Sequence, residues 1–253
     1  YTGSGSSKVN DCPGHFGHIN LARPVFHAGF IDATLKILRS VCFHCSRLRV
    51  DRSDVKFRMA MKVKNAALRL NLIHEICRAK TRCAFGMADV EENVKENNES
   101  RPERPSGCGG WQPKFSKQNL KVEVEYPHDL DDVPGSGDRK QFLPASKVLE
   151  IFKNISDEDI SILGLNPLYC RPDWLIVTIL PVPPPHVRPS VALDGGAARS
   201  EDDLTHQLVN IIKVNNSFEN FIRTGEPAHI LEQFEMLLQY KISALFDNEQ
   251  AGQ

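Results

Sequence analysis

Apolar residues recur at intervals of three and four along much of the chain, the spacing that places them on one face of an α-helix. This pattern predicts helices over 32–38, 54–76 and 146–152. Two longer helical patterns follow residue 200, with Gly225-Glu-Pro227 between them, and so predict an antiparallel helical hairpin. The apolar positions of these two helices are Leu204, Leu208 and Ile211, then Leu231, Phe234, Leu238, Ile242 and Leu245.

Other segments have the patterns of strands, caps and loops. Residues 120–126 alternate between apolar and polar, as in a half-buried strand, and 174–180 form a β-rich apolar run suited to a buried strand. Ser156 and Asp159 are spaced as a capping box, and Ser200 with Asp203 can begin the hairpin. Proline-rich 181–189 should be extended, followed by a glycine-containing loop at 194–199. The fold class is therefore α+β, with a small sheet.

The 253 residues, 41% of them hydrophobic, can form one or two cores. We find no run of eighteen apolar residues and no signal-peptide pattern, so we expect an intracellular protein without membrane insertion. The net charge of -1 hides a basic block: residues 36–82 carry thirteen Lys and Arg against three Asp and Glu. Such a block is either the solvated face of ordinary helices or a phosphate-facing surface, and charge alone does not distinguish them.

The cysteines point to a metal. Cys42-Phe-His-Cys45 is a knuckle whose two thiolates can bind one tetrahedral ion. Cys83 and the glycine-flanked Cys108 can supply the other two ligands, although Cys77 competes with Cys83. The alternative is that these are buried free thiols, but a structural four-cysteine zinc site is favoured.

Two further clusters carry potential chemistry. Cys12, His15 and His18 lie within seven residues and could provide two metal ligands, but a zinc hydrolase would also need a nearby Glu base. Asp202 and Asp203 are better explained by the start of a helix than by magnesium binding. We predict no catalytic residue, and the phosphate-loop, nucleophile-elbow and dinucleotide motifs do not occur.

Four segments resemble the largest subunits of eukaryotic RNA polymerases, those of polymerase II above all. They are 12–27, which begins with Cys12-Pro-Gly-His-Phe-Gly-His18, then 35–45, 171–190 and 200–206. The resemblance covers about residues 11–253 and implies the N-terminal clamp, a fragment of a nuclear DNA-directed RNA polymerase. It implies a nucleotidyltransferase whose magnesium-binding catalytic loop lies downstream, so this chain alone should be inactive.

The resemblance also implies two zinc sites. One uses the residues matching Cys42, Cys45, Cys83 and Cys108, the same four as the spacing suggests. The second uses those matching Cys12 and His15 with an upstream cysteine pair, which residues 1–9 lack. We therefore expect the second zinc to be weakly bound or missing.

By the same resemblance the clamp closes over DNA and the RNA–DNA hybrid and contacts other polymerase subunits, including the second-largest. The expected divisions are a linker or trimmed end at 1–10, a zinc-binding clamp head at 11–130, a clamp core with proline strut and lid-like loop at 131–199, and the hairpin at 200–253. Arg188 and Arg199 of the lid-like loop should contact nucleic acid. Phe218 and Phe221, at the hairpin tip, should anchor initiation and elongation factors if exposed, or cap the hairpin core if not. The rival reading is a stand-alone zinc-binding adaptor.

Overall fold

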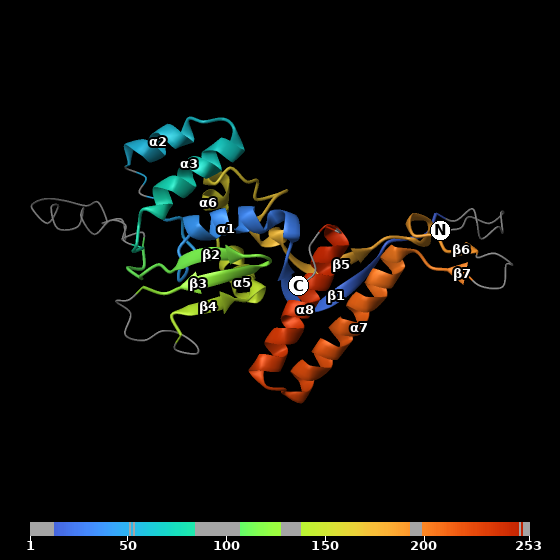
Figure 1. Ribbon diagram of the computed structural model, residues 1–253. Coiled ribbons are helices and arrows are strands. Elements are labelled where there is room, and N and C mark those ends of the chain that lie inside the picture. The colour runs from blue at the N-terminus through green and yellow to red at the C-terminus, as the bar shows by residue number, and fades with distance from the viewer. Residues whose placement is uncertain are drawn as a thin grey trace, which may run out of the picture. The chain divides into compact units, whose positions relative to one another are not determined.

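The computed structural model describes residues 13–50, 52, 54–83, 107–127, 138–192, 199–247 and 249, and it has the predicted α+β composition (Figure 1). Its contacts divide the chain into two compact units, Gly29–Ile176 and the combination of Tyr1–Ala28 with Val177–Gln253. The second of these units is discontinuous in sequence, because strand β1 (Gly17–Phe26) pairs with the distant β5 (Ile176–Val182), and the four consecutive divisions stay a prediction. Among the described residues, no helix has the length and apolarity needed to cross a membrane.

The unit Gly29–Ile176 packs short helices with a three-stranded sheet. The single helix expected at 54–76 is wrong, because the polar Asn65 begins a new helix by accepting hydrogen bonds from Ala67 N and Leu68 N. The elements are the short 3-10 turn η2 (Ala28–Phe30), α1 (Ile31–Ser40), α2 (Val55–Met61), α3 (Ala66–Arg78), β2 (Lys114–Gln118), β3 (Lys121–Glu125), β4 (Lys140–Leu143), α5 (Ala145–Lys153), α6 (Asp157–Ile162) and the 3-10 turn η3 (Pro172–Leu175).

The predicted strand at 120–126 is β3, the middle strand of the antiparallel order β2-β3-β4. Its alternation works as expected, since Val122 and Val124 are buried while their neighbours are half-exposed. Ser156 caps α6 by accepting a hydrogen bond from Asp159 N at 3.2 Å, which confirms the predicted helix start. The carboxylate of Asp159 in turn accepts from Leu48 N, so the same residue fixes the loop that follows α1.

The second unit contains β1, β5 and the helical hairpin formed by α7 (Asp203–Thr224) and α8 (Ala228–Phe246), which confirms the predicted hairpin. The cap is Asp202, which accepts from Leu204 N, rather than Ser200. Short elements η4 (Pro185–Val187), β6 (Val191–Ala192) and β7 (Arg199–Ser200) join β5 to α7. The core residues are Val25, Leu180, Leu208, Ile211, Phe218, Leu238 and Ile242.

Two predictions for the segment before the hairpin need correction. The run at 174–180 was expected to be a buried strand, yet Trp174 and Leu175 form a 3-10 turn and Ile179 in β5 is 54% exposed. In the part of the chain that the structure describes, β5 pairs with β1 alone, and Leu180 on one of its faces joins the hairpin core while Ile179 lies on the opposite face. The proline-rich segment is extended only in part, because Pro185 begins the turn η4.

Candidate metal centre

Cys42 and Cys45 lie in a tight turn directly after α1. The turn closes through two backbone hydrogen bonds, from Cys42 N to Arg47 O at 2.8 Å and from Ser46 N to Cys42 O at 3.0 Å. Ser46 has a positive φ of 58°, which lets the chain reverse just beyond Cys45. The knuckle therefore holds both thiols on the same side of a short loop.

Cys83 and Cys108 are brought together by a second pair of backbone bonds. Cys83 N donates to Gly110 O at 2.9 Å, and Gly109 N donates to Cys83 O at 2.7 Å. Gly110 is needed for its size, because a Cβ there would lie 2.8 Å from the His44 ring. This close approach places Cys83 and Cys108 directly beside the loop that carries Cys42 and Cys45.

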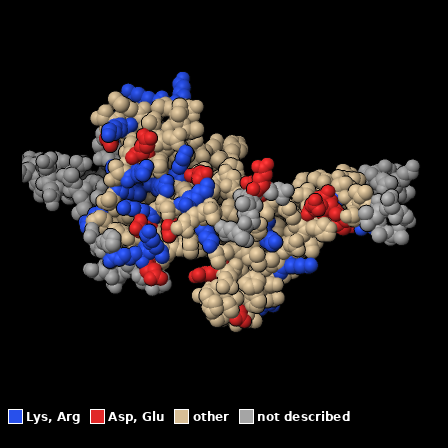
Figure 2. Space-filling view, viewed as in Figure 1, with Lys and Arg blue, Asp and Glu red and all other residues tan. Residues whose placement is uncertain are grey.

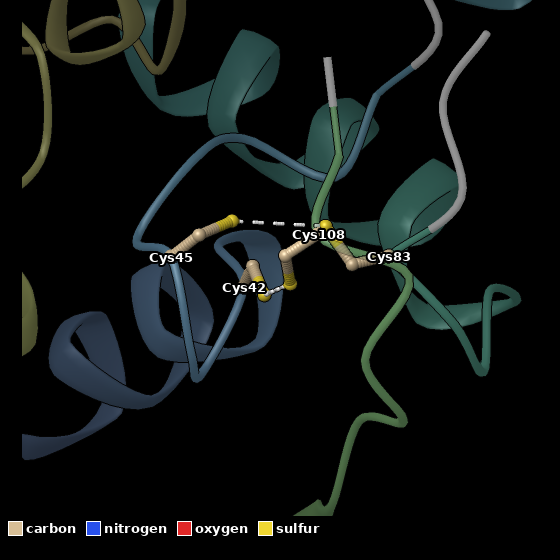
Figure 3. Close-up of side chains that lie close together, drawn as sticks. All are labelled: Cys42, Cys45, Cys83 and Cys108. Carbon is tan, nitrogen blue, oxygen red and sulfur yellow. Dashed lines mark hydrogen bonds between the residues drawn. The ribbon is translucent and has the colours of Figure 1, made fainter. Parts of the chain in front are cut away.

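The four thiols point toward one another (Figure 3). All four sulfur atoms lie within 4.8 Å of each other, with 3.6 Å between the Sγ atoms of Cys42 and Cys108 and 3.8 Å between those of Cys45 and Cys83. Ligands about 2.3 Å from a tetrahedral zinc ion stand about 3.8 Å apart, so the donor set and its spacing fit such an ion. Among the described residues, this is the one cluster of three or more potential ligands that could hold a metal.

The pKa values of the thiols are shifted in opposite directions. Burial acts to raise the pKa of Cys42, but hydrogen bonds from the backbone of Cys45 and His44 outweigh it, and the pKa falls below its ordinary value. Burial raises the pKa values of Cys45 and Cys83. Without a cation, therefore, the cluster favours the thiolate form of Cys42 and disfavours that of Cys45 and Cys83, and a bound divalent ion would favour the thiolate form of all its ligands.

A buried cation lies beside the cluster. Arg49 is only 4% exposed, and its guanidinium donates hydrogen bonds to the carbonyl oxygens of Arg39 and Lys80. Burial lowers its pKa, while the nearby thiols of Cys77, Cys42 and Cys83 act in the opposite direction. A positive charge at this position partly balances the negative charge of a four-thiolate site.

The competition between Cys77 and Cys83 is resolved in favour of Cys83. Cys77 is fully buried on α3 and is outside the four-sulfur cluster. Burial raises the pKa of Cys77 to about 12, so it remains a neutral, apolar thiol.

The structure gives less information about the predicted metal site at Cys12, His15 and His18. His15 and His18 are both exposed, and Cys12 lies outside the described residues, so the second predicted zinc site stays a prediction. Asp202 caps α7 through its side chain, in agreement with a structural role for the carboxylate pair.

The remaining predicted site residues lie in the second unit. Arg188 is half-buried and donates to Pro183 O at 3.0 Å and to Thr205 Oγ1 at 3.2 Å, whereas Arg199 is exposed and donates to Ser190 Oγ. Of the two alternatives for Phe218, an exposed anchor or a residue that caps the hairpin core, the first does not fit: the ring is fully buried in the hairpin core and stacks with that of Phe234, with 6.5 Å between centroids. The alternative of a core-capping role describes it correctly.

Sequence reasoning missed Gln112, which is 6% exposed and contacts the metal cluster directly. It also missed Arg49, which resembled any other member of the basic block. The available signal was position alone: Gln112 follows Cys108 by four residues, near enough to face the same ion.

Comparison with known proteins identifies the class of protein. A sequence model of the family described as RNA polymerase Rpb1, domain 1, matches residues 4–253, and the chain therefore belongs to this family. The chain is also 44% identical over 252 residues to the DNA-directed RNA polymerase II subunit RPB1 of Euplotoides octocarinatus. That match covers 100% of this chain and 49% of the relative, so the chain spans about half the length of the curated relative.

Proposed function

We propose that this chain forms the clamp of the largest subunit of a nuclear RNA polymerase II. The observation that carries the proposal is the family match over 4–253, supported by a four-cysteine cluster at the residues that the resemblance assigns to zinc. In this role the chain holds DNA and the RNA–DNA hybrid during RNA synthesis. The chemistry is positioning and electrostatics, and the magnesium-dependent nucleotidyl transfer belongs to the intact enzyme.

We propose that Cys42, Cys45, Cys83 and Cys108 bind one zinc ion. Four protein ligands leave a tetrahedral ion without an open position for water or substrate, so the ion's contribution is structural. The ion joins the loop after α1, which carries Cys42 and Cys45, to Cys83 in the segment after α3 and to Cys108 in the segment before β2. The second zinc, at Cys12 and His15, is weakly bound or missing.

The basic block supports the nucleic-acid role. Lys and Arg side chains crowd over the unit Gly29–Ile176 around α1 (Figure 2). Burial lowers the pKa of His74 on α3, and the charges of Arg39, Arg78 and Lys36 lower it further. A bound phosphate backbone would relieve this repulsion between like charges and release counterions.

The lid-like loop has a defined base. Val191 pairs with Ser200 and Ala192 with Arg199, where β6 and β7 are antiparallel. Arg188 fixes one side of this base through Pro183 and Thr205, so we assign it the role of aiming the loop. Arg199 is exposed and is the better candidate for a direct phosphate contact.

The hairpin tip, residues 215–226, is the proposed docking site for initiation and elongation factors. Phe221 is half-buried and packs edge-on against Phe234, with a centroid distance of 4.7 Å. A partly exposed aromatic ring can become an anchor when a partner covers it. Phe218 is buried and stacks with Phe234 in the core, so in this proposal it does not contact the partner itself.

Nucleic-acid binding can be tested with charge reversal on α2. The variant Lys56→Glu with Arg58→Glu changes two exposed cations, and its matched control is Lys213→Glu with Arg223→Glu, two exposed cations on the hairpin. We expect affinity for duplex DNA to fall steeply with salt, by several-fold or more between about 50 and 200 mM, and the slope to flatten in the α2 variant. A wild-type affinity independent of salt would contradict the nucleic-acid role.

Assembly distinguishes the clamp from a stand-alone zinc-binding adaptor. A tagged chain expressed with the remaining part of the largest subunit and with the second-largest subunit should co-purify with both through gel filtration. An adaptor unrelated to transcription would elute alone under the same conditions.

A further inference from the structure

Gln112 connects all three segments that carry the four cysteines, two through its side chain and the third through its backbone. Its Nε2 atom lies 3.2 Å from Cys42 Sγ and 3.0 Å from Gly110 O, and its Oε1 atom lies 2.9 Å from Phe43 N. The backbone N–H of the same residue donates to Thr81 O at 2.8 Å, close to Cys83. One residue thus contacts the knuckle, the Cys83 segment and the Cys108 loop.

The orientation of this amide is determined by its partners. A backbone N–H can only donate, so the oxygen of the amide must face Phe43 N. The amide nitrogen then faces a sulfur and a carbonyl oxygen, both of which accept. The reversed amide would place two donors together at Phe43 N and point its oxygen at two acceptors, so only one orientation pairs each donor with an acceptor.

Burial makes these contacts consequential. Gln112 is 6% exposed, and Cys42 is fully buried, so water does not readily replace the amide as a donor to this sulfur. His44 N also donates to Cys42 Sγ, at 3.4 Å. Cys42 therefore receives hydrogen bonds from the backbone of its own knuckle and one from the Gln112 amide, and the amide bond comes from the opposite half of the centre.

We propose that Gln112 is a positioning residue of the metal centre, which orients Cys42 through an N–H···S hydrogen bond and holds the two cysteine pairs in register. This inference rests on the proposed zinc site and goes beyond its four ligands. Partners that orient metal ligands commonly contribute 10- to 100-fold to metal affinity, on the order of what we expect here.

Two substitutions separate the hydrogen bonds from the packing. Gln112→Met keeps a side chain of similar length and removes the hydrogen bonds, while Gln112→Glu keeps the shape and replaces the donor by a negative charge facing Cys42 Sγ. Gln118 on β2 is exposed, so Gln118→Met and Gln118→Glu are matched controls with the same chemical changes. All are made in the full 253-residue chain.

The experiment measures zinc affinity by competition with a chromogenic chelator, and the sulfur-to-metal charge-transfer band after cobalt is substituted for zinc. We expect about 10-fold weaker zinc binding for Gln112→Met, a larger loss for Gln112→Glu, and no change in either control. The cobalt band of Gln112→Met should shift to lower energy, because a sulfur that loses a hydrogen bond becomes a stronger electron donor.

The outcomes distinguish this inference from the zinc proposal. If the wild-type chain bound neither zinc nor cobalt, the zinc site itself would be refuted. If the wild-type chain bound zinc but Gln112→Met matched it in affinity and spectrum, the positioning role would be wrong. Saturating zinc should restore the melting temperature of Gln112→Met, and a temperature that stays low would show that Gln112 acts only through packing.

Discussion

The four-cysteine region and the helical hairpin are held together in different ways. Around the cysteines, short loops meet with little apolar contact: the local cluster consists of Cys42 and Cys83 with Cys45 packed against them. In the hairpin, two long helices bury a continuous row of aliphatic and aromatic side chains against β1 and β5. A loop region of this kind needs a cross-link, whereas the hairpin can rely on burial.

The buried polar contacts of the two regions also have different partners. In the hairpin, two buried amides bind the backbone of β1. Asn215 accepts from Ala22 N and donates to Asn20 O, and Gln239 accepts from Phe26 N and donates to Phe26 O. These amides fix the register of a strand on an apolar core, whereas Gln112 supports a metal ligand. Buried amide side chains therefore have two uses in this chain. Where a strand packs on an apolar core they fix its register, and where short loops meet with little apolar contact one of them hydrogen-bonds to a cysteine of the cluster.

The largest expected effect comes from removing one thiolate. Cys83→Ser should abolish tight zinc binding, and a structural zinc ion can supply about 10–16 kcal/mol to a small domain. Hydrogen exchange should then show lost protection over residues 29–83 and 107–127, with the hairpin still protected. Cys170→Ser, at an exposed cysteine outside the cluster, is the matched control. Equal loss of protection in both units would contradict a difference between a zinc-dependent loop region and a hairpin held by apolar burial.

The next effect is on the hairpin core. Phe218→Ala should destabilise the hairpin unit by about 3–5 kcal/mol, because it leaves a cavity where a fully buried ring packs beside Phe234. Phe221→Ala should cost less stability, since that ring is half-buried, but should weaken factor binding more. Denaturant unfolding and pull-down with elongation factors measure the two effects. A reversed order of stabilities would contradict the assigned roles.

A smaller effect is expected from the amides on β1. Gln239→Ala leaves the N–H and the carbonyl of Phe26 without their present partner, at a cost of about 1–3 kcal/mol for each buried group left unsatisfied. Gln233→Ala changes an exposed glutamine of the same helix and should be neutral. Thermal unfolding of the two variants tests the difference. Zinc affinity should be unchanged in both.

The smallest effect concerns the turn of the hairpin. Gly225 has φ 75° and donates to Phe221 O, ending α7 in the left-handed conformation. Gly225→Ala should cost about 1–2 kcal/mol, purely from backbone conformation, because nothing lies within 4 Å of the added Cβ. Gly225→Asn should cost less. If alanine were as stable as glycine in a melting experiment, the turn would not depend on this conformation.

Sequence reasoning was most successful where the pattern is local. The hairpin, the cap at Ser156 and the strand β3 follow from apolar spacing and capping chemistry, and the four cysteines from their spacing and their flanking glycines. It failed where distant segments decide the outcome. No pattern within Gly17–Phe26 predicts that this segment pairs with β5, and the burial of Phe218 depends on packing against α8. The contacts of Gln112 could not be predicted for the same reason, since its partners Cys42 and Phe43 are some seventy residues away in the sequence.

The most direct test of the account is the metal content and ligand set of the purified chain, measured by elemental analysis and zinc K-edge X-ray absorption. We predict one tightly bound zinc ion per chain, surrounded by four sulfur atoms at about 2.3 Å. A chain without zinc, or a zinc ion bound by nitrogen or oxygen in place of any of these sulfurs, would contradict it.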